Sequence, residues 1–229
     1  LANVPPHFLK EKPEFVDPYQ MIVIDVHKRF GRWDDILDEP PPPLTLPITH
    51  AHYHFARGLA FAAKGDIHGA YDEWDRFKIA RSLVPEDAVM GINPAHKVLS
   101  IANYMLMGEI AFRCGRITDA VRYLRIGVER EDSLLYMEPP EWVQPLRHTL
   151  GAVLLYAKRY DEAEAVYRKD LEHWPENAWS LLGLSKCLRA AGKTSESNEV
   201  QKRFDKAWAR ADTKADSSCL CVPGDEPQR

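Results

Sequence analysis

The stretch HTLGAVLLYAKRYDEAEAVYRKDLEHWPENAWSLLG, residues 148–183, contains two amphipathic segments joined by a short polar turn. Gly151 is followed by Lys158, Ala163 and Tyr167, at offsets of 7, 12 and 16 residues. Small residues in two antiparallel helices let the backbones approach closely, and a large side chain at the last offset fills the space beside them. The stretch therefore predicts a helix hairpin.

The same offsets occur in two earlier copies, at Gly58, Gly65, Ala70 and Trp74, and at Gly108, Gly115, Ala120 and Leu124. A further glycine, Gly183, begins another copy. This repetition resembles the tetratricopeptide repeat (TPR) and covers most of the chain, from about Tyr19 to Trp208. The resemblance implies an all-α, TPR-like α-solenoid of antiparallel helix hairpins.

Successive glycines of this series are separated by 50, 43 and 32 residues, whereas an ordinary repeat has about 34. Long inter-repeat insertions are therefore expected, at 81–94 and 129–145, and loops of this length are often functional. We expect a single helical domain over 1–212, with a last helix from about Ser195 to Asp212. Its expected parts are a degenerate hairpin (18–38), a proline strap (38–48) and repeat units at 50–81, 95–130, 144–175 and 176–212, followed by a disordered tail (213–229).

The strap is expected from PPPPLTLP, residues 40–47. Polyproline is stiff and extended and has no backbone donors with which to join a sheet. The segment is interpreted as a rigid strap over the solenoid, and a partner-binding motif is the alternative.

Particular strings, including RFGRWDDIL and HFARGLAFAAKGD, resemble the C-terminal half of long, mostly bacterial TPR proteins of uncharacterised function. Because that group has further repeats upstream and this chain begins at Leu1, the chain is expected to be a fragment or processed product. The resemblance implies no substrate.

Composition fits a helical globular protein, with 45% hydrophobic and 28% charged residues. The net charge of -4 and the interspersed acidic and basic residues argue against nucleic-acid binding, which needs a concentrated basic surface. The longest apolar stretch, LGAVLLYA, is too short to span a bilayer. A cytoplasmic location is expected unless an upstream targeting segment has been removed.

Four cysteines are too few and too scattered for a disulfide framework. Cys114 and Cys187 fall in helical segments and are interpreted as small buried hydrophobes. Cys219 and Cys221 form a C-x-C pair in the polar tail. They could share a soft metal or form a redox pair, and the alternative is a disordered end.

Motifs for nucleophilic catalysis, phosphate binding and dinucleotide binding are absent from the sequence. The string HAHYHF instead brings His50, His52 and His54 together at the start of a helix. His50 and His54 are four residues apart, a spacing able to chelate a metal on one helix face. The alternative for His54 is a core histidine whose hydrogen bonds are satisfied.

In the repeat register, His52 belongs to the concave groove. Apolar groups line much of this groove, which suits a small ligand or a metal better than a charged peptide. Related domains hold acidic chaperone tails with a set of lysines, arginines and asparagines at these positions, and this groove lacks that set. The candidate groove residues are His52, Phe55, Met105, Glu109, His148, Asn177 and Ser180.

The segment YMEPPEWVQPLRH, residues 136–148, leads into the third unit through prolines that fix an extended approach. It could place Glu138, Trp142 and Arg147 at the rim of the groove. The alternative is a structural ion pair between Glu138 and Arg147, with Trp142 filling a gap.

The sharpest hypothesis is that His52, Glu109 and His148 converge in the groove. Two imidazoles and a carboxylate could bind a divalent transition metal, or act as acid and base toward a small polar ligand. The alternative is a solvated groove whose polar residues do not meet.

Two function classes therefore remain. One is a TPR-type interaction scaffold that binds a segment of a protein partner on the solenoid surface. The other is a small-molecule-binding protein or enzyme with a metal or acid/base site in the groove. The sequence names no reaction, and a fold resemblance cannot supply one.

Overall fold

The computed structural model describes residues 5, 7 and 11–221. The helices in this part of the chain are α2 (Pro13–Val16), the 3-10 helix η1 (Asp17–Tyr19), α3 (Ile22–Arg29), α4 (Trp33–Asp38), α5 (Pro47–Ala63), α6 (Ile67–Ser82), α7 (Ala95–Arg113), α8 (Ile117–Asp132), α9 (Leu146–Tyr156), α10 (Tyr160–His173), α11 (Ala178–Ala190) and α12 (Thr194–Trp208). The described strands, β1 (Val89–Met90) and β2 (Asn93–Pro94), form a short antiparallel pair.

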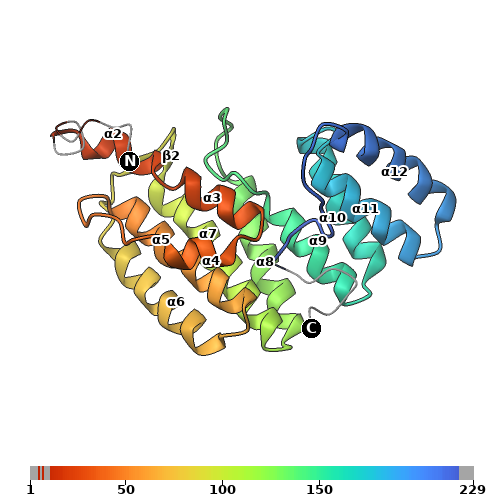
Figure 1. Ribbon diagram of the computed structural model, residues 1–229, viewed down its shortest axis with the longest axis horizontal. Coiled ribbons are helices and arrows are strands. Elements are labelled where there is room, and N and C mark those ends of the chain that lie inside the picture. The colour runs from red at the N-terminus through yellow and green to blue at the C-terminus, as the bar shows by residue number, and fades with distance from the viewer. Residues whose placement is uncertain (1–4, 6, 8–10, 222–229) are drawn as a thin grey trace.

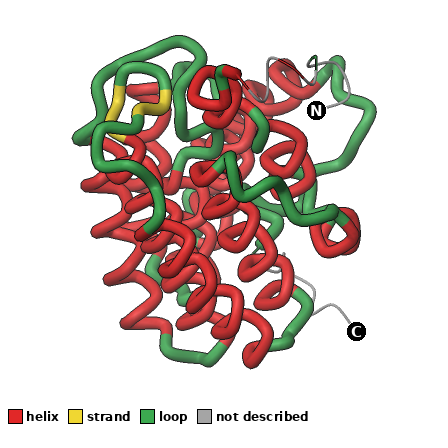
Figure 2. Tube along the Cα trace, turned by 90° about the vertical axis from the view of Figure 1, so that its left-hand side faces the viewer, coloured by secondary structure: helices red, strands yellow, loops and turns green. Residues whose placement is uncertain are grey.

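The long helices pair as successive hairpins, α5 with α6, α7 with α8, α9 with α10, and α11 with α12. These hairpins stack side by side into an elongated all-α solenoid, as the repeat predicts (Figure 1). Seen end on, the described helices form layers with loops gathered at their ends (Figure 2).

In the first three hairpins, the residue seven places after the repeat glycine lies just past the end of the first helix. Gly65 and Gly115 take φ values of +85° and +73° there, in the left-handed region that glycine adopts without a Cβ penalty. Lys158 holds the same place in the third hairpin with φ +59°. A side chain is therefore tolerated at this turn, although it is conformationally less favourable than glycine.

The repeat glycines allow close approach between helices, as their spacing predicts. A Cβ atom on Gly151 would lie 2.4 Å from Cζ of Tyr167, and one on Gly183 would lie 2.3 Å from the same atom. The Tyr167 ring therefore lies between α9 and α11. Leu124 fills the corresponding place beside Gly108, where an added Cβ would lie 2.7 Å from its Cγ.

The two insertions contact each other rather than extending separately from the solenoid. Asn93 in the first insertion donates from Nδ2 to the carbonyl of Leu135 in the second at 3.0 Å. It accepts from the Leu135 amide at 2.8 Å and also donates to Glu141 at 3.0 Å. One buried amide side chain thus joins loops that are about forty residues apart in sequence.

Residues 39–46 connect α4 to α5, and Asp17 caps the start of α5. The Asp17 carboxylate accepts from the backbone amides of Ile48 and Thr49, each at 2.8 Å. Carboxylates at a helix N-terminus satisfy amides that have no partner within the helix. This contact fixes the end of the proline-rich connection against the N-terminal region.

The C-terminal region differs from the expectation in two places. The last helix ends at Trp208 rather than at Asp212. Residues 217–221, which belong to the tail expected to be disordered, are largely buried against the solenoid. The sequence suggested disorder because this segment is polar and short, but it gains hydrogen bonds from the groove. Residues 222–229 lie outside the described residues.

Within the described residues, none of the helices is both long enough and apolar enough to cross a membrane.

Replacing Gly151 or Gly183 by alanine should lower the free energy of unfolding by about 1–3 kcal/mol, because each added methyl would overlap the Tyr167 ring. This loss opposes the roughly 1 kcal/mol by which alanine favours a helix over glycine. Urea denaturation measures the free energy of unfolding of each variant. The double variant should lose less stability than the sum of the two single losses, since both methyls displace the same ring. Variants as stable as the parent would contradict this packing.

Candidate functional site

The inner face of the solenoid is covered by two segments from outside the four hairpins. Helix α3 contacts α5 through Asp25 and α11 through Arg29, and residues 217–221 lie against α9 and α10. Of the predicted groove residues, His52, Glu109, His148 and Ser180 are each no more than 1% exposed. The groove is therefore filled rather than solvated.

Helix α3 is held on α5 by a buried charged cluster. The Asp25 carboxylate oxygen Oδ1 accepts from Lys28 Nζ at 2.6 Å and contacts His52 Nε2 at 3.1 Å. Lys28 is 3% exposed and lies over the ring of Trp142, 4.8 Å from its centroid. Trp142 also packs against His52 and Phe55, so the second insertion closes over this cluster.

The charges in this cluster compensate one another. Burial alone would raise the pKa of Asp25, but the nearby Lys28 and His52 outweigh it and hold that pKa well below its usual range. The carboxylate therefore stays ionised beside the buried ammonium group. A buried ion pair of this kind positions α3, and losing one partner would leave an uncompensated charge.

The other end of α3 contacts α11. The Arg29 guanidinium lies 3.9 Å from the centroid of a Trp179 ring, and Phe30 contacts the same indole edge to face. Stacking of arginine on tryptophan is a favourable cation–π arrangement. Helix α3 therefore spans from the first hairpin to the fourth.

Residues 217–221 enter the groove beside α9 and α10. Ser218 Oγ donates to the His148 carbonyl at 2.8 Å and lies 2.7 Å from the Tyr167 hydroxyl. Cys219 and Cys221 form a disulfide whose sulfurs lie near Thr149 Oγ1. The C-x-C pair is thus a closed disulfide in a buried position.

Glu109 acts on this segment through Arg113. Arg113 Nε donates to Glu109 Oε1 at 2.8 Å, and its Nη2 donates to the carbonyl of Cys221. Burial raises the pKa of Glu109 to about 7, although Arg113 opposes the shift. Glu109 therefore orients a guanidinium that recognises a backbone carbonyl.

His148 belongs to a different cluster. Its Nε2 lies 3.0 Å from Asp170 Oδ2, and Ser180 Oγ donates to the same oxygen at 2.6 Å. Burial lowers the pKa of His148, with Asp170 opposing. Because serine and histidine both bond to the aspartate and not to each other, the arrangement is not a nucleophilic triad.

The expected convergence of His52, Glu109 and His148 is not what the contacts show. His52 bonds to Asp25, Glu109 to Arg113 and His148 to Asp170, so each joins its own cluster. In the described part of the chain, no group of three or more histidine, cysteine, aspartate or glutamate side chains is placed to hold a metal ion. Each residue has its own partner: Asp25 comes from α3, Arg113 lies one turn further along α7, and Asp170 comes from α10.

The remaining candidates take structural positions. Glu138 accepts from the Tyr136 hydroxyl at 2.6 Å, whereas Arg147 forms a two-point ion pair with Asp132. The alternative pairing of Glu138 with Arg147 is therefore wrong as well. Asn177 caps α11, accepting from the Trp179 amide at 3.0 Å. Met105 is buried in the core.

An apolar hollow of about 450 Å³ opens beside α3, next to the Asp25 cluster. The sequence did not predict it, because its walls come from three separate segments. They are the first turns of the chain before and within α3, the β1–β2 turn and the second insertion. Its lining includes Met21, Ile22, Met90, Met137 and Val143, and Asp25 contributes the acidic group nearest the cluster.

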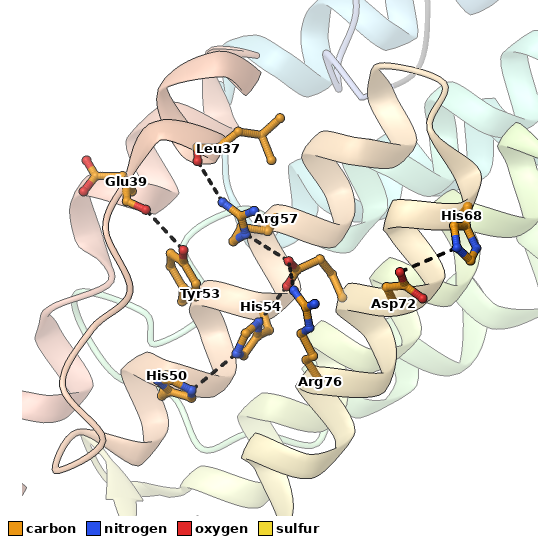
Figure 3. Close-up of polar contacts among 10 residues, drawn as sticks. Leu37, Glu39, His50, Tyr53, His54, Arg57, His68, Asp72 and Arg76 are labelled. Carbon is orange, nitrogen blue, oxygen red and sulfur yellow. Dashed lines mark hydrogen bonds and ion pairs between the residues drawn. The ribbon is translucent and has the colours of Figure 1, made fainter.

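A second histidine cluster lies on the outer side of α5. His54 Nδ1 is 2.6 Å from Glu73 Oε2 on α6, and His54 Nε2 is 3.3 Å from His50 Nε2 (Figure 3). Arg57 and Arg76 each donate to Glu73 Oε1 at 3.0 Å. His54 thus has a partner on the neighbouring helix, and it also faces His50.

Replacing Asp25 by asparagine should lower the free energy of unfolding by about 3–5 kcal/mol, because Lys28 would remain buried without its counter-charge. The double variant Asp25→Asn with Lys28→Met should recover most of this loss, since it removes both charges. Chemical denaturation of the single and double variants measures the difference. A double variant as unstable as Asp25→Asn alone would contradict the assigned pairing.

No protein-family model matches the chain, and no curated protein matches it. Two crystal structures of the TPR-like repeats of a putative kinesin light chain from Podosopora anserina are similar to it, one of them carrying a single substitution. The substituted structure aligns with a TM-score of 0.51 and 14% identity, covering 87% of this chain and 97% of its own. The other aligns with a TM-score of 0.51 and 13% identity, covering 89% and 100%. At such identity the likeness shows the fold alone, which is that of TPR-like repeats.

Proposed function

We propose that this chain is a TPR-type interaction scaffold that binds an extended segment of a partner protein on its inner face. The binding place is the part of the groove where residues 217–221 lie. The observation that carries the proposal is that this surface holds a short polypeptide segment, with Arg113 donating to the Cys221 carbonyl and the Ser218 hydroxyl bonding to the His148 carbonyl.

Of the two segments that cover the inner face, the tail and not α3 is the one that a partner segment would replace. Helix α3 is fixed by the ion pair of Asp25 and Lys28 and by stacking on Trp179. The tail is held by a few hydrogen bonds and has no ion pair of this kind among its described contacts with the solenoid.

A tethered tail competes with any partner because its effective concentration is high, in the millimolar range for a short flexible connection. A partner segment must therefore bind more tightly than the tail or meet a chain whose tail has been displaced. Ser218 is the position at which to displace it, since its hydroxyl lies between the Tyr167 hydroxyl and the His148 carbonyl.

The test uses the full chain with Ser218→Trp, and Lys214→Trp at an exposed tail position as the matched control. A labelled peptide of residues 212–221, with its disulfide closed, should bind the Ser218→Trp chain at least tenfold more tightly than the control chain, because the indole cannot fit where Ser218 lies. Fluorescence anisotropy measures the affinity, and circular dichroism checks that both chains are folded. Equal affinity for the two chains, or binding to neither, would contradict the proposal.

The apolar hollow beside α3 favours a second candidate function, a small-molecule-binding protein. Its walls are mostly apolar, and two acidic residues, Asp25 beside His52 and Glu141 from the second insertion, also line it. Pockets for small ligands commonly combine an apolar lining with a few polar groups of fixed position. The ligand class that fits is a small apolar molecule with one polar end.

Methyl NMR of labelled methionines tests this candidate with decanol as the probe. Met21, Met90 and Met137 line the hollow, whereas Met105 lies in the core and serves as an internal control. The three lining methyl signals should shift together and saturably on titration, while that of Met105 stays in place. Shifts of all the methionines alike, or of none, would remove the hollow as a binding site.

A further inference from the structure

His50 and His54 lie one turn apart on α5 with their ring nitrogens facing each other. The two Nε2 atoms are 3.3 Å apart, and the ring centroids are 4.9 Å apart in an edge-to-face arrangement (Figure 3). A zinc ion bound by two imidazoles has Zn–N bonds of about 2.0–2.1 Å and near-tetrahedral angles, which place the nitrogens about 3.3–3.4 Å apart. The separation found here matches that of a shared cation, and without a cation the same two nitrogens lie within hydrogen-bond distance.

Glu73 fixes which nitrogen of His54 is available. Its Oε2 lies 2.6 Å from His54 Nδ1, so the proton of a neutral His54 ring resides on Nδ1. The lone pair of Nε2 then points toward His50. Metal-binding histidines commonly donate their other N–H to a carboxylate in this way, which orients the ring and raises its basicity.

Glu73 is itself held in place from two sides. Its side chain is 2% exposed, and Oε1 accepts from Arg57 and Arg76, each at 3.0 Å. Two arginines against one carboxylate leave this group with a net positive charge. A metal cation would therefore be bound through the imidazole nitrogens and not by general attraction to acidic groups.

His50 completes the pair from the first turn of the helix. Burial lowers the pKa of His50 and the neighbouring His54 lowers it further, whereas a backbone hydrogen bond to Pro42 raises it. Within strict hydrogen-bond geometry the buried ring nitrogen Nδ1 has no partner.

We propose that His50 and His54 bind one divalent transition-metal ion, with Glu73 as the positioning residue behind His54 and water as the remaining ligands. Neutral imidazoles suit zinc, nickel and copper ions, and copper should bind most tightly by the usual order of affinities. Because the two ligands bridge the first turn of α5, the ion would stabilise the start of that helix beside the proline-rich connection.

The test is thermal unfolding of the tag-free full chain with Zn²⁺, Ni²⁺ or Cu²⁺, without reductant so that Cys219 and Cys221 remain disulfide-bonded. At a metal concentration about tenfold above the dissociation constant, the melting temperature should rise by about 3–6 °C. His50→Ala should abolish the rise. His68→Ala is the matched control, because His68 is 90% exposed, lies four residues from Asp72 and takes no part in the pair; it should melt like the parent with and without metal.

Isothermal titration of Glu73→Gln provides a second measurement, with an expected affinity loss of about 10–100-fold because the amide no longer orients the His54 ring as a carboxylate does. An unchanged metal-dependent shift in His50→Ala, or no metal-dependent shift in the parent at any concentration short of precipitation, would overturn the assignment. If the Glu73→Gln chain binds metal as tightly as the parent, Glu73 does not position His54 for metal binding.

Discussion

The phenol side chain of Tyr167 connects the packing of the repeats with the occupation of their inner face. Its ring lies between Gly151 and Gly183, which leaves no room for a methyl group on either helix, and its hydroxyl contacts Ser218 of the tail. A smaller residue would leave a cavity between two hairpins, and a larger one would separate them. The spacing of α9 and α11, and hence the width of the groove that receives the tail, depends on this one ring.

Charge placement determines what covers the rest of the inner face. Solenoids of this kind usually leave the concave surface to a partner, but here Asp25 and Lys28 supply α3 with a buried ion pair that is completed by His52. Trp142 then closes over the lysine from the second insertion. The apolar hollow adjoins this cluster through Asp25, so a covered polar surface and an open apolar one meet at this residue.

The repeat offsets predicted the helix hairpins because each offset has a separate geometric cause. Gly58, Gly108 and Gly151 mark close approach, and the residue seven places later marks the left-handed turn. The site was less predictable. The register placed His52, Glu109 and His148 on the inner face, but Asp25 and Cys221 come from irregular ends whose docking has no periodic signal. The i,i+3 spacing of Asp25 and Lys28 is compatible with an ion pair, but the same spacing occurs on many exposed helices and does not indicate burial.

The contact between Arg113 and Cys221 joins residues 108 positions apart in the chain. In an open repeat array each unit touches only its neighbours, so the array can unfold one unit at a time from an end. Here α3 links the first hairpin to the fourth through Trp179, and the tail links the last part of the chain back to α7. Such long-range links raise the contact order and slow folding. They also couple the terminal units, so fraying of one end of the solenoid requires loss of contacts at the other.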